Sequence, residues 1–187
     1  MFIQTESTPN PNSLKFILEH EFMKDKTFEF NTIEDCESSD LAADLFNIDG
    51  VESIFFGSNF ISINKHKYDW DQLKASILTK IADYLSSGKS IIKEDVSNLL
   101  VDEVTEYDIA DKEVVSQIKE LLISKIKPAV AQDGGDIEFK KFKDGVVYLA
   151  LQGSCAGCPS SSMTLKTGIE NLLKHYVREV KSVEQYI

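Results

Sequence analysis

The amino-acid sequence predicts two small α+β domains joined by an acidic linker. Its 187 residues are enough for one ordinary domain or two small ones, at roughly 100–200 residues per domain. Hydrophobic residues make up 42% and charged residues 27%, which is typical of a folded protein and not of a disordered chain. Residues 1–110 carry 9 basic and 21 acidic side chains, a net charge of −12, whereas residues 111–187 carry 11 and 10, a net charge of +1. This contrast indicates two separately built parts.

The first domain is expected at residues 1–86. Alternating apolar and polar residues predict two strands on either side of the proline-containing turn Thr8–Asn12. A short helix and a hairpin around Gly57–Asn59 follow, and then a longer helix whose apolar residues recur every three or four positions. In chain order, these elements are expected at residues 2–6, 13–19, 40–47, 51–56, 60–64 and 70–85.

Residues 87–110 are interpreted as a flexible linker, because they are acidic and lack clear periodicity apart from a short helix expected near residues 96–101. The second domain, residues 111–187, is expected in the order helix-strand-strand-helix-strand. Its first helix is expected to end near Pro128 or soon after, before the turn Asp133–Asp136. The later elements are expected at residues 137–142 and 146–152, in a helix that follows Cys158, and at residues 182–186.

Composition disfavours several classes of partner and compartment. The acidic first part repels phosphate backbones, which argues against nucleic-acid binding. No apolar run approaches the roughly 18–20 residues that a membrane span needs, and the N-terminus resembles neither a secretory signal nor a transit peptide. Three cysteines, an odd number, favour a reducing compartment over a disulfide framework. We therefore expect a cytoplasmic protein, or an organelle protein already trimmed.

Chemistry in this chain is expected at Cys155 and Cys158, between a predicted strand and a predicted helix. Pro159 suits the first helical position, which puts Cys158 at or beside the helix N-terminus. The positive end of the helix dipole favours a thiolate there. Gly153 and Gly157 leave room around the sulfurs, so that backbone amides can approach. The spacing brings both sulfurs onto one metal ion or cluster.

Three functions compete for such a pair. A thiol–disulfide exchanger also carries Cys-x-x-Cys at a helix start, but no proline follows Pro159 to form the wall used by thioredoxin-like sites. Structural zinc needs four ligands, and the one downstream histidine, His175, lies too far along the helix. An iron–sulfur cluster usually takes four thiolates, and Cys36 lies in the other predicted domain. Two chains that share one cluster, with two thiolates each, satisfy this count.

Two segments of the chain resemble a known family. Asp133–Asp136 followed by Gly153–Ser161 resembles the NifU C-terminal domain of Nfu-type iron–sulfur scaffold and carrier proteins, and Thr8–Phe16 resembles the N-terminal domain of the two-domain form. The resemblance implies that Cys155 and Cys158 bind a [4Fe–4S] cluster, or else a [2Fe–2S] cluster, bridged between two subunits of a homodimer.

The same resemblance implies a carrier and not an enzyme. It would receive the cluster from upstream assembly proteins and pass it to apo iron–sulfur client proteins. The implied compartment is the bacterial cytoplasm, or the mitochondrial matrix if a transit peptide has been removed. A thiol–disulfide redox module that uses the same cysteine pair is the alternative function.

Overall fold

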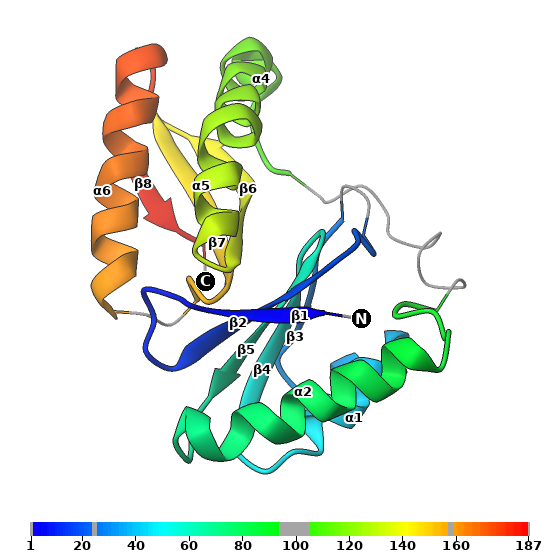
Figure 1. Cartoon of the computed structure of the whole chain (residues 1–187). Helices are drawn as coiled ribbons and strands as arrows, with labels where there is room; N and C mark the ends of the chain where they lie inside the picture. The colour runs from blue at the N-terminus through cyan, green and yellow to red at the C-terminus, as the bar shows by residue number, and fades with distance from the viewer. Residues whose placement is uncertain (1, 24–25, 94–104, 157–158, 187) are drawn as a thin grey trace. The chain divides into compact units, whose positions relative to one another are not determined.

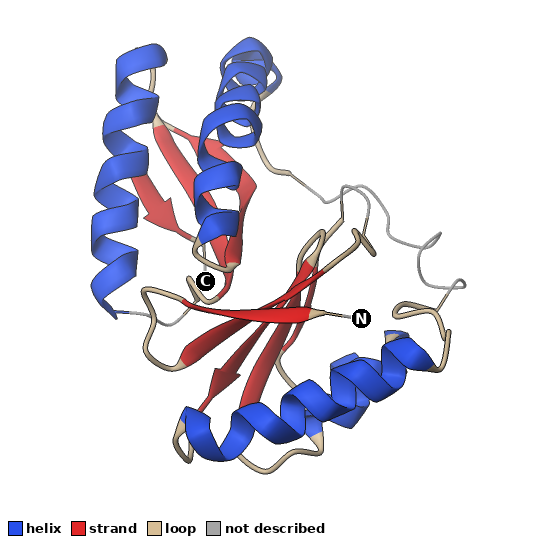
Figure 2. Ribbon diagram, in the orientation of Figure 1, coloured by secondary structure: helices blue, strands red, loops and turns tan. Residues whose placement is uncertain are grey.

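The computed structural model describes residues 2–23, 26–93, 105–156 and 159–186. The chain divides into two compact units, Met1–Val101 and Asp102–Ile187. Each unit combines helices with its own β-sheet, as Figures 1 and 2 show, so the expected α+β fold class is confirmed. Among the helices of the described residues, none combines the length and apolar character that crossing a membrane would require.

The first unit contains a five-stranded antiparallel sheet with the strand order β1-β2-β5-β4-β3. Helices α1 and α2 pack together, and both contribute to the core beside this sheet (Figure 1). The bounds are β1 Ile3–Ser7, β2 Ser13–Leu18, β3 Phe28–Phe30, a 3₁₀ turn η1 Glu34–Ser38, α1 Asp40–Phe46, β4 Val51–Phe56, β5 Phe60–Lys65 and α2 Trp70–Ser86.

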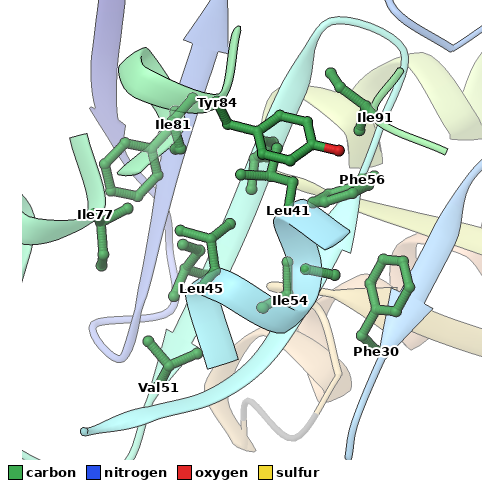
Figure 3. Packing of buried hydrophobic residues seen from close by; sticks show 14 of the residues in the cluster. Phe30, Leu41, Leu45, Val51, Ile54, Phe56, Ile77, Ile81, Tyr84 and Ile91 are labelled. Atoms are coloured by element: carbon green, nitrogen blue, oxygen red, sulfur yellow. The ribbon is translucent and has the colours of Figure 1, made fainter. Parts of the chain in front are cut away.

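Periodicity in the sequence explains why these segments form strands and helices. On α2, Leu73, Ile77 and Ile81 recur at helical spacing and are buried in the core. The Ser39 side chain caps α1 by accepting a hydrogen bond from the Ala42 N–H. Figure 3 shows the core formed by these elements, with labelled side chains from strands and helices: Phe30, Leu41, Leu45, Val51, Ile54, Phe56, Ile77, Ile81, Tyr84 and Ile91.

Both flanks of the expected linker contact the units. Ile91 and Ile92 are buried in the first core, and the Ser39 hydroxyl donates to the Ile91 carbonyl at 2.6 Å. On the other side, Glu106 forms an isolated bridge with Lys141 of the second unit. The short helix expected near residues 96–101 lies outside the described residues. The domain boundaries at 1–86, 87–110 and 111–187 therefore stay a prediction.

The second unit contains a three-stranded sheet with the order β6-β7-β8. Strands β6 and β7 form an antiparallel hairpin, and β8 pairs with β7 in parallel after a helical crossover. The expected order helix-strand-strand-helix-strand is confirmed. The bounds are a 3₁₀ turn η2 Ile109–Asp111, α4 Lys112–Leu121, a π-helical turn η3 Leu122–Ile126, α5 Lys127–Gln132, β6 Gly135–Lys143, β7 Val146–Gly153, α6 Pro159–Tyr176 and β8 Ser182–Gln185.

The first helix of this unit continues for four residues past Pro128, to Gln132. A proline lacks an N–H donor, and its ring conflicts with the carbonyl four residues earlier in a regular helix. The π-helical turn η3 stands directly before it, and there the Lys127 N–H donates to the Leu122 carbonyl five residues back. The wider turn accommodates the proline, so the helix reaches the glycine turn that leads into β6.

Candidate functional site

The described part of the cysteine loop, residues 153–156, connects the end of β7 to the segment before α6. Strand β7 ends at Gly153, which has a positive φ of 66° and turns the chain out of the sheet. The Ala156 N–H donates to the Gly153 carbonyl at 3.1 Å and tightens this turn. Cys155 is 3% exposed and belongs to the core of the second unit. The loop thus places the Cys155 side chain inward.

Gly135, the first residue of β6, leaves the space that Cys155 occupies. It pairs with Gly153 across the hairpin. A Cβ atom at Gly135 would lie 2.8 Å from the Cys155 Sγ and 2.5 Å from the Gln152 carbonyl oxygen, distances that real Cβ atoms essentially never show. The second glycine of the Asp133–Asp136 turn is therefore required for close packing against the sulfur and the backbone.

Ser154 fastens the cysteine loop to the turn between α5 and β6. Its hydroxyl donates to the Asp133 carbonyl, and its backbone N–H donates to the Gly134 carbonyl at 3.2 Å. The turn is itself held to α5, because the Gly134 N–H donates to the Ala131 carbonyl at 3.1 Å. Ser154 is buried, so these bonds are shielded from water.

An ion pair joins α5 to the start of β6. The Lys127 Nζ lies 2.8 Å from the Asp136 Oδ2, and the Asp136 side chain is largely buried whereas that of Lys127 is partly exposed. Asp136 directly follows Gly135, the residue against which Cys155 packs. The pair therefore ties the first residue of α5 to the turn that supports the cysteine loop.

The structure places some of the residues singled out by the sequence but not all of them. Cys158 and Gly157 lie outside the described residues, so the geometry between the two sulfurs stays a prediction. Cys36 lies in η1 of the first unit, and His175 stacks edge-on against the neighbouring Tyr176 near the end of α6. In the described ranges, no group of three or more His, Cys, Asp or Glu side chains is arranged to hold a metal ion.

Family models match both units of the chain. The model described as "Scaffold protein Nfu/NifU N terminal" covers residues 3–88, and the model described as "NifU-like domain" covers residues 118–184. The human protein "NFU1 iron-sulfur cluster scaffold homolog, mitochondrial" is 47% identical over 187 residues, which is 99% of this chain and 72% of the human one. The chain belongs to the Nfu/NifU family.

A second relative is similarly close, and a solved structure is more distant. The Arabidopsis thaliana "NifU-like protein 4, mitochondrial" is 46% identical over 188 residues, or 99% of this chain and 66% of that protein. A solution structure of a NifU-like protein from Saccharomyces cerevisiae is 28% identical, with a TM-score of 0.46 over 50% of this chain and 86% of its own. The family resemblance inferred from the sequence motifs is confirmed.

Within this Nfu/NifU fold, sequence reasoning missed the residues that support Cys155. It identified the Asp133–Asp136 turn and the neighbouring glycines, but not the bond from Ser154 to Asp133 or the pair between Lys127 and Asp136. Ser154 stands directly before Cys155 in the sequence, which is the one local signal that could have drawn attention to it. Its partner lies 21 positions earlier and is brought close only by the hairpin register.

Proposed function

We propose that this protein is an iron–sulfur cluster scaffold and carrier that holds a [4Fe–4S] cluster through Cys155 and Cys158 and passes it to apo-proteins. The observation that carries this proposal is the position of Cys155, in a loop between β7 and α6 inside the part of the chain that matches the NifU-like domain. The printed name of the human relative, an iron–sulfur cluster scaffold homolog, supports it.

The number of available thiolates favours a cluster shared by two chains. A cluster takes about four cysteine ligands, and this loop offers two per chain. Cys36 is a poor third ligand, because it is buried in the first unit and its pKa is raised to about 11 by burial and by the nearby Asp35 and Glu34 carboxylates. A thiol must lose its proton to bind iron. Two chains with four thiolates then hold four irons, whereas a [2Fe–2S] cluster would leave two irons per pair.

The cluster is cargo for this protein and not a resident cofactor. Its bonds to the carrier are iron–thiolate bonds, and each can be exchanged for a bond to a thiolate of an incoming apo-protein without any change in oxidation state. The helix α6 begins at Pro159, directly after Cys158 in the sequence, so unpaired N–H groups at its N-terminus favour the anionic thiolates. The partners are upstream assembly proteins and apo iron–sulfur clients, and no catalysed reaction is required.

The compartment that the relatives favour is the mitochondrion. Both the human protein and the Arabidopsis thaliana protein are named as mitochondrial. The expectation of a bacterial cytoplasmic protein gains no support from these relatives, and we propose the alternative expectation, the mitochondrial matrix. Localisation of the tagged full-length gene product in its own cells tests this assignment.

Anaerobic reconstitution of the full chain with iron and sulfide tests the proposed function. We expect a brown protein with about two irons and two sulfides per chain, and native mass spectrometry should show a dimer that carries one [4Fe–4S] cluster. About one iron per chain in a dimer would indicate a [2Fe–2S] cluster instead. A protein that stays colourless and iron-free but cycles between dithiol and disulfide would overturn the proposal in favour of the redox module.

A further inference from the structure

The Cys155 side chain lies in a position that does not suit a ligand shared between two chains. It is 3% exposed, and its Sγ packs against Gly135 at the start of β6. A bridging cluster bonds directly to the ligand sulfur, and two chains can reach the same cluster only where their sulfurs face solvent. The sulfur must therefore leave this packed position before it can bind.

The contacts that would oppose this movement converge on Ser154. The hydroxyl bond to the Asp133 carbonyl and the N–H bond to the Gly134 carbonyl hold the residue directly before Cys155. Both acceptors belong to a turn that α5 fixes through the bond from the Gly134 N–H to the Ala131 carbonyl. These two bonds therefore hold the backbone that leads directly into Cys155.

We propose that Ser154 is a positioning residue that keeps Cys155 packed against Gly135, so that the thiol becomes available to a cluster only when the bonds from Ser154 to the Asp133–Gly134 turn open. The loop then has two states, one in which the Cys155 thiol is buried and one in which it is exposed. The inference rests on the proposed role of Cys155 as a ligand. Its test measures the thiol alone, so a failure of iron binding and a failure of this inference are distinguishable.

Alkylation of the metal-free protein measures how accessible the Cys155 and Cys36 thiols are. Iodoacetamide is added at concentrations where the rate is proportional to the reagent, and peptide mass spectrometry reports Cys155 and Cys36 separately. In the parent protein, Cys155 should react far more slowly than it does after unfolding in urea. The Ser154→Ala variant loses the hydroxyl bond to the Asp133 carbonyl and the contact of that hydroxyl with the Cys155 Sγ at 4.0 Å, and it keeps the backbone bond to Gly134. We expect Cys155 to react about fivefold faster in it, which corresponds to about 1 kcal/mol.

Ser124→Ala is the matched control variant. Its hydroxyl also donates to a backbone carbonyl, that of Glu120 at 2.7 Å, but Ser124 is exposed on η3 and is not part of the cysteine loop. We expect the Cys155 rate in this variant to equal that of the parent. Cys36, which is equally buried in the other unit, should keep its rate in both variants.

The urea dependence of the Cys155 alkylation rate in the parent protein distinguishes a local opening of the loop from global unfolding. A local opening exposes little surface, so the Cys155 rate should rise only weakly at low urea, with a slope well below that of global unfolding. A Cys155 rate in Ser154→Ala equal to that of the parent would overturn the proposal. So would a parent rate that follows global unfolding at every urea concentration, a result that stands even if the variant fails to fold.

Discussion

Cys36 and Cys155 are equally buried, yet their local structure differs. Cys36 sits inside the 3₁₀ turn η1, where its Sγ lies 3.5 Å from the Thr32 carbonyl oxygen. Burial and the nearby Asp35 and Glu34 carboxylates raise its pKa to about 11. Cys155 sits in a loop between a strand and a helix. It packs against Gly135 and follows Ser154, whose hydroxyl is bonded to the Asp133 carbonyl.

Burial alone therefore does not separate Cys155, the proposed ligand, from Cys36, which is expected to be structural. A buried thiol with carboxylates nearby has a raised pKa, so iron must displace a more tightly held proton to bind it. A thiol in a loop that is closed by a few hydrogen bonds can be released without unfolding the unit around it. We therefore expect the Cys155 loop to release its thiol by a local opening and Cys36 to serve only in packing. The following variants test each expectation.

The largest effect is expected from removing the proposed ligand. Cys155→Ser should reduce the iron content of the reconstituted protein to near zero, because serine is a poor donor for iron compared with a thiolate. Cys158→Ser should do the same. Cys36→Ser is the matched control and should retain nearly full iron, since that thiol is assigned to packing.

Iron and sulfide are measured per chain, and far-ultraviolet circular dichroism checks that each cysteine variant is folded. A fully loaded Cys155→Ser protein would remove the ligand assignment. Loss of iron in a folded Cys36→Ser protein would remove the distinction between the two thiols.

Gly135→Ala tests the packing around Cys155. The added Cβ would lie 2.5 Å from the Gln152 carbonyl oxygen, and a backbone carbonyl within a paired strand cannot move away cheaply. We expect the second unit to lose about 3 kcal/mol of unfolding free energy. Gly168→Ala, in α6, is the control: a Cβ there meets nothing within 4 Å, and alanine in a helix should add about 0.5–1 kcal/mol.

Urea unfolding measures both glycine variants with two probes. Circular dichroism follows the whole chain, whereas the fluorescence of Trp70, the single tryptophan, follows only the first unit. The Trp70 transition should be the same in both variants. A Gly135→Ala protein as stable as the parent would show that the close approach to Cys155 can be relieved, which would weaken the packed position described for the sulfur.

The fold was largely predictable because most elements depend on local patterns. Apolar periodicity along α2 and alternation along β2 determine their type without any tertiary partner. Strand β3 and the turn η1 were missed. The segment Phe28–Phe30 does alternate apolar and polar residues, but a run of three residues is too short to identify a strand, and β3 is defined by its pairing with β4, for example Phe28 with Phe56.

The candidate site was predictable only in its chemistry. The spacing of the cysteines and the glycine turn singled out Cys155 from the sequence, because metal-ligand patterns are local, and its role as a ligand stays a prediction. The bond from Ser154 to Asp133 and the ion pair between Lys127 and Asp136 join residues that the hairpin register and the helix end bring together. Such contacts depend on tertiary structure, and no pattern of neighbouring residues predicts them.

A smaller effect, on the stability of the first unit, is expected from Cys36 at alkaline pH. Its pKa is raised from an ordinary value of 9.0 to about 11, so the folded chain binds the proton more tightly than the unfolded chain. The resulting stability is fully present below pH 9 and is lost as the pH rises from about 9 to about 11. The loss attributable to Cys36 is about 2 kcal/mol at most.

Cys36→Ala isolates this contribution, because every other titrating group is shared with the parent. Urea unfolding followed by Trp70 fluorescence should show that the first unit of the parent loses more stability between pH 8 and about pH 11 than the same unit of the variant does. The absolute stability of the variant is not compared, since it also loses packing. Parallel pH profiles in the two proteins would mean that the Cys36 thiol is not perturbed by its acidic surroundings.

The smallest effect is expected at Ser39, the counterpart of Ser154 near the other cysteine. Ser39 follows Cys36 by three residues, its N–H donates to the Cys36 carbonyl, and its hydroxyl both caps α1 and donates to the Ile91 carbonyl. Ser39→Ala leaves the Ile91 carbonyl and the Ala42 N–H without their bonds to the serine hydroxyl. We expect the first unit to lose about 1 kcal/mol of unfolding free energy.

The Ser39 variant distinguishes a serine that supports a unit from one that controls a thiol. Its lower stability should appear in the Trp70 transition, and Cys36 should react faster with iodoacetamide only in proportion to that global loss. Iron content and the Cys155 rate should not change. The opposite outcome is that Ser39→Ala makes Cys36 react faster without lowering the stability of the first unit. Both serines would then control local access to a thiol, and the serine would not distinguish the proposed ligand Cys155 from Cys36.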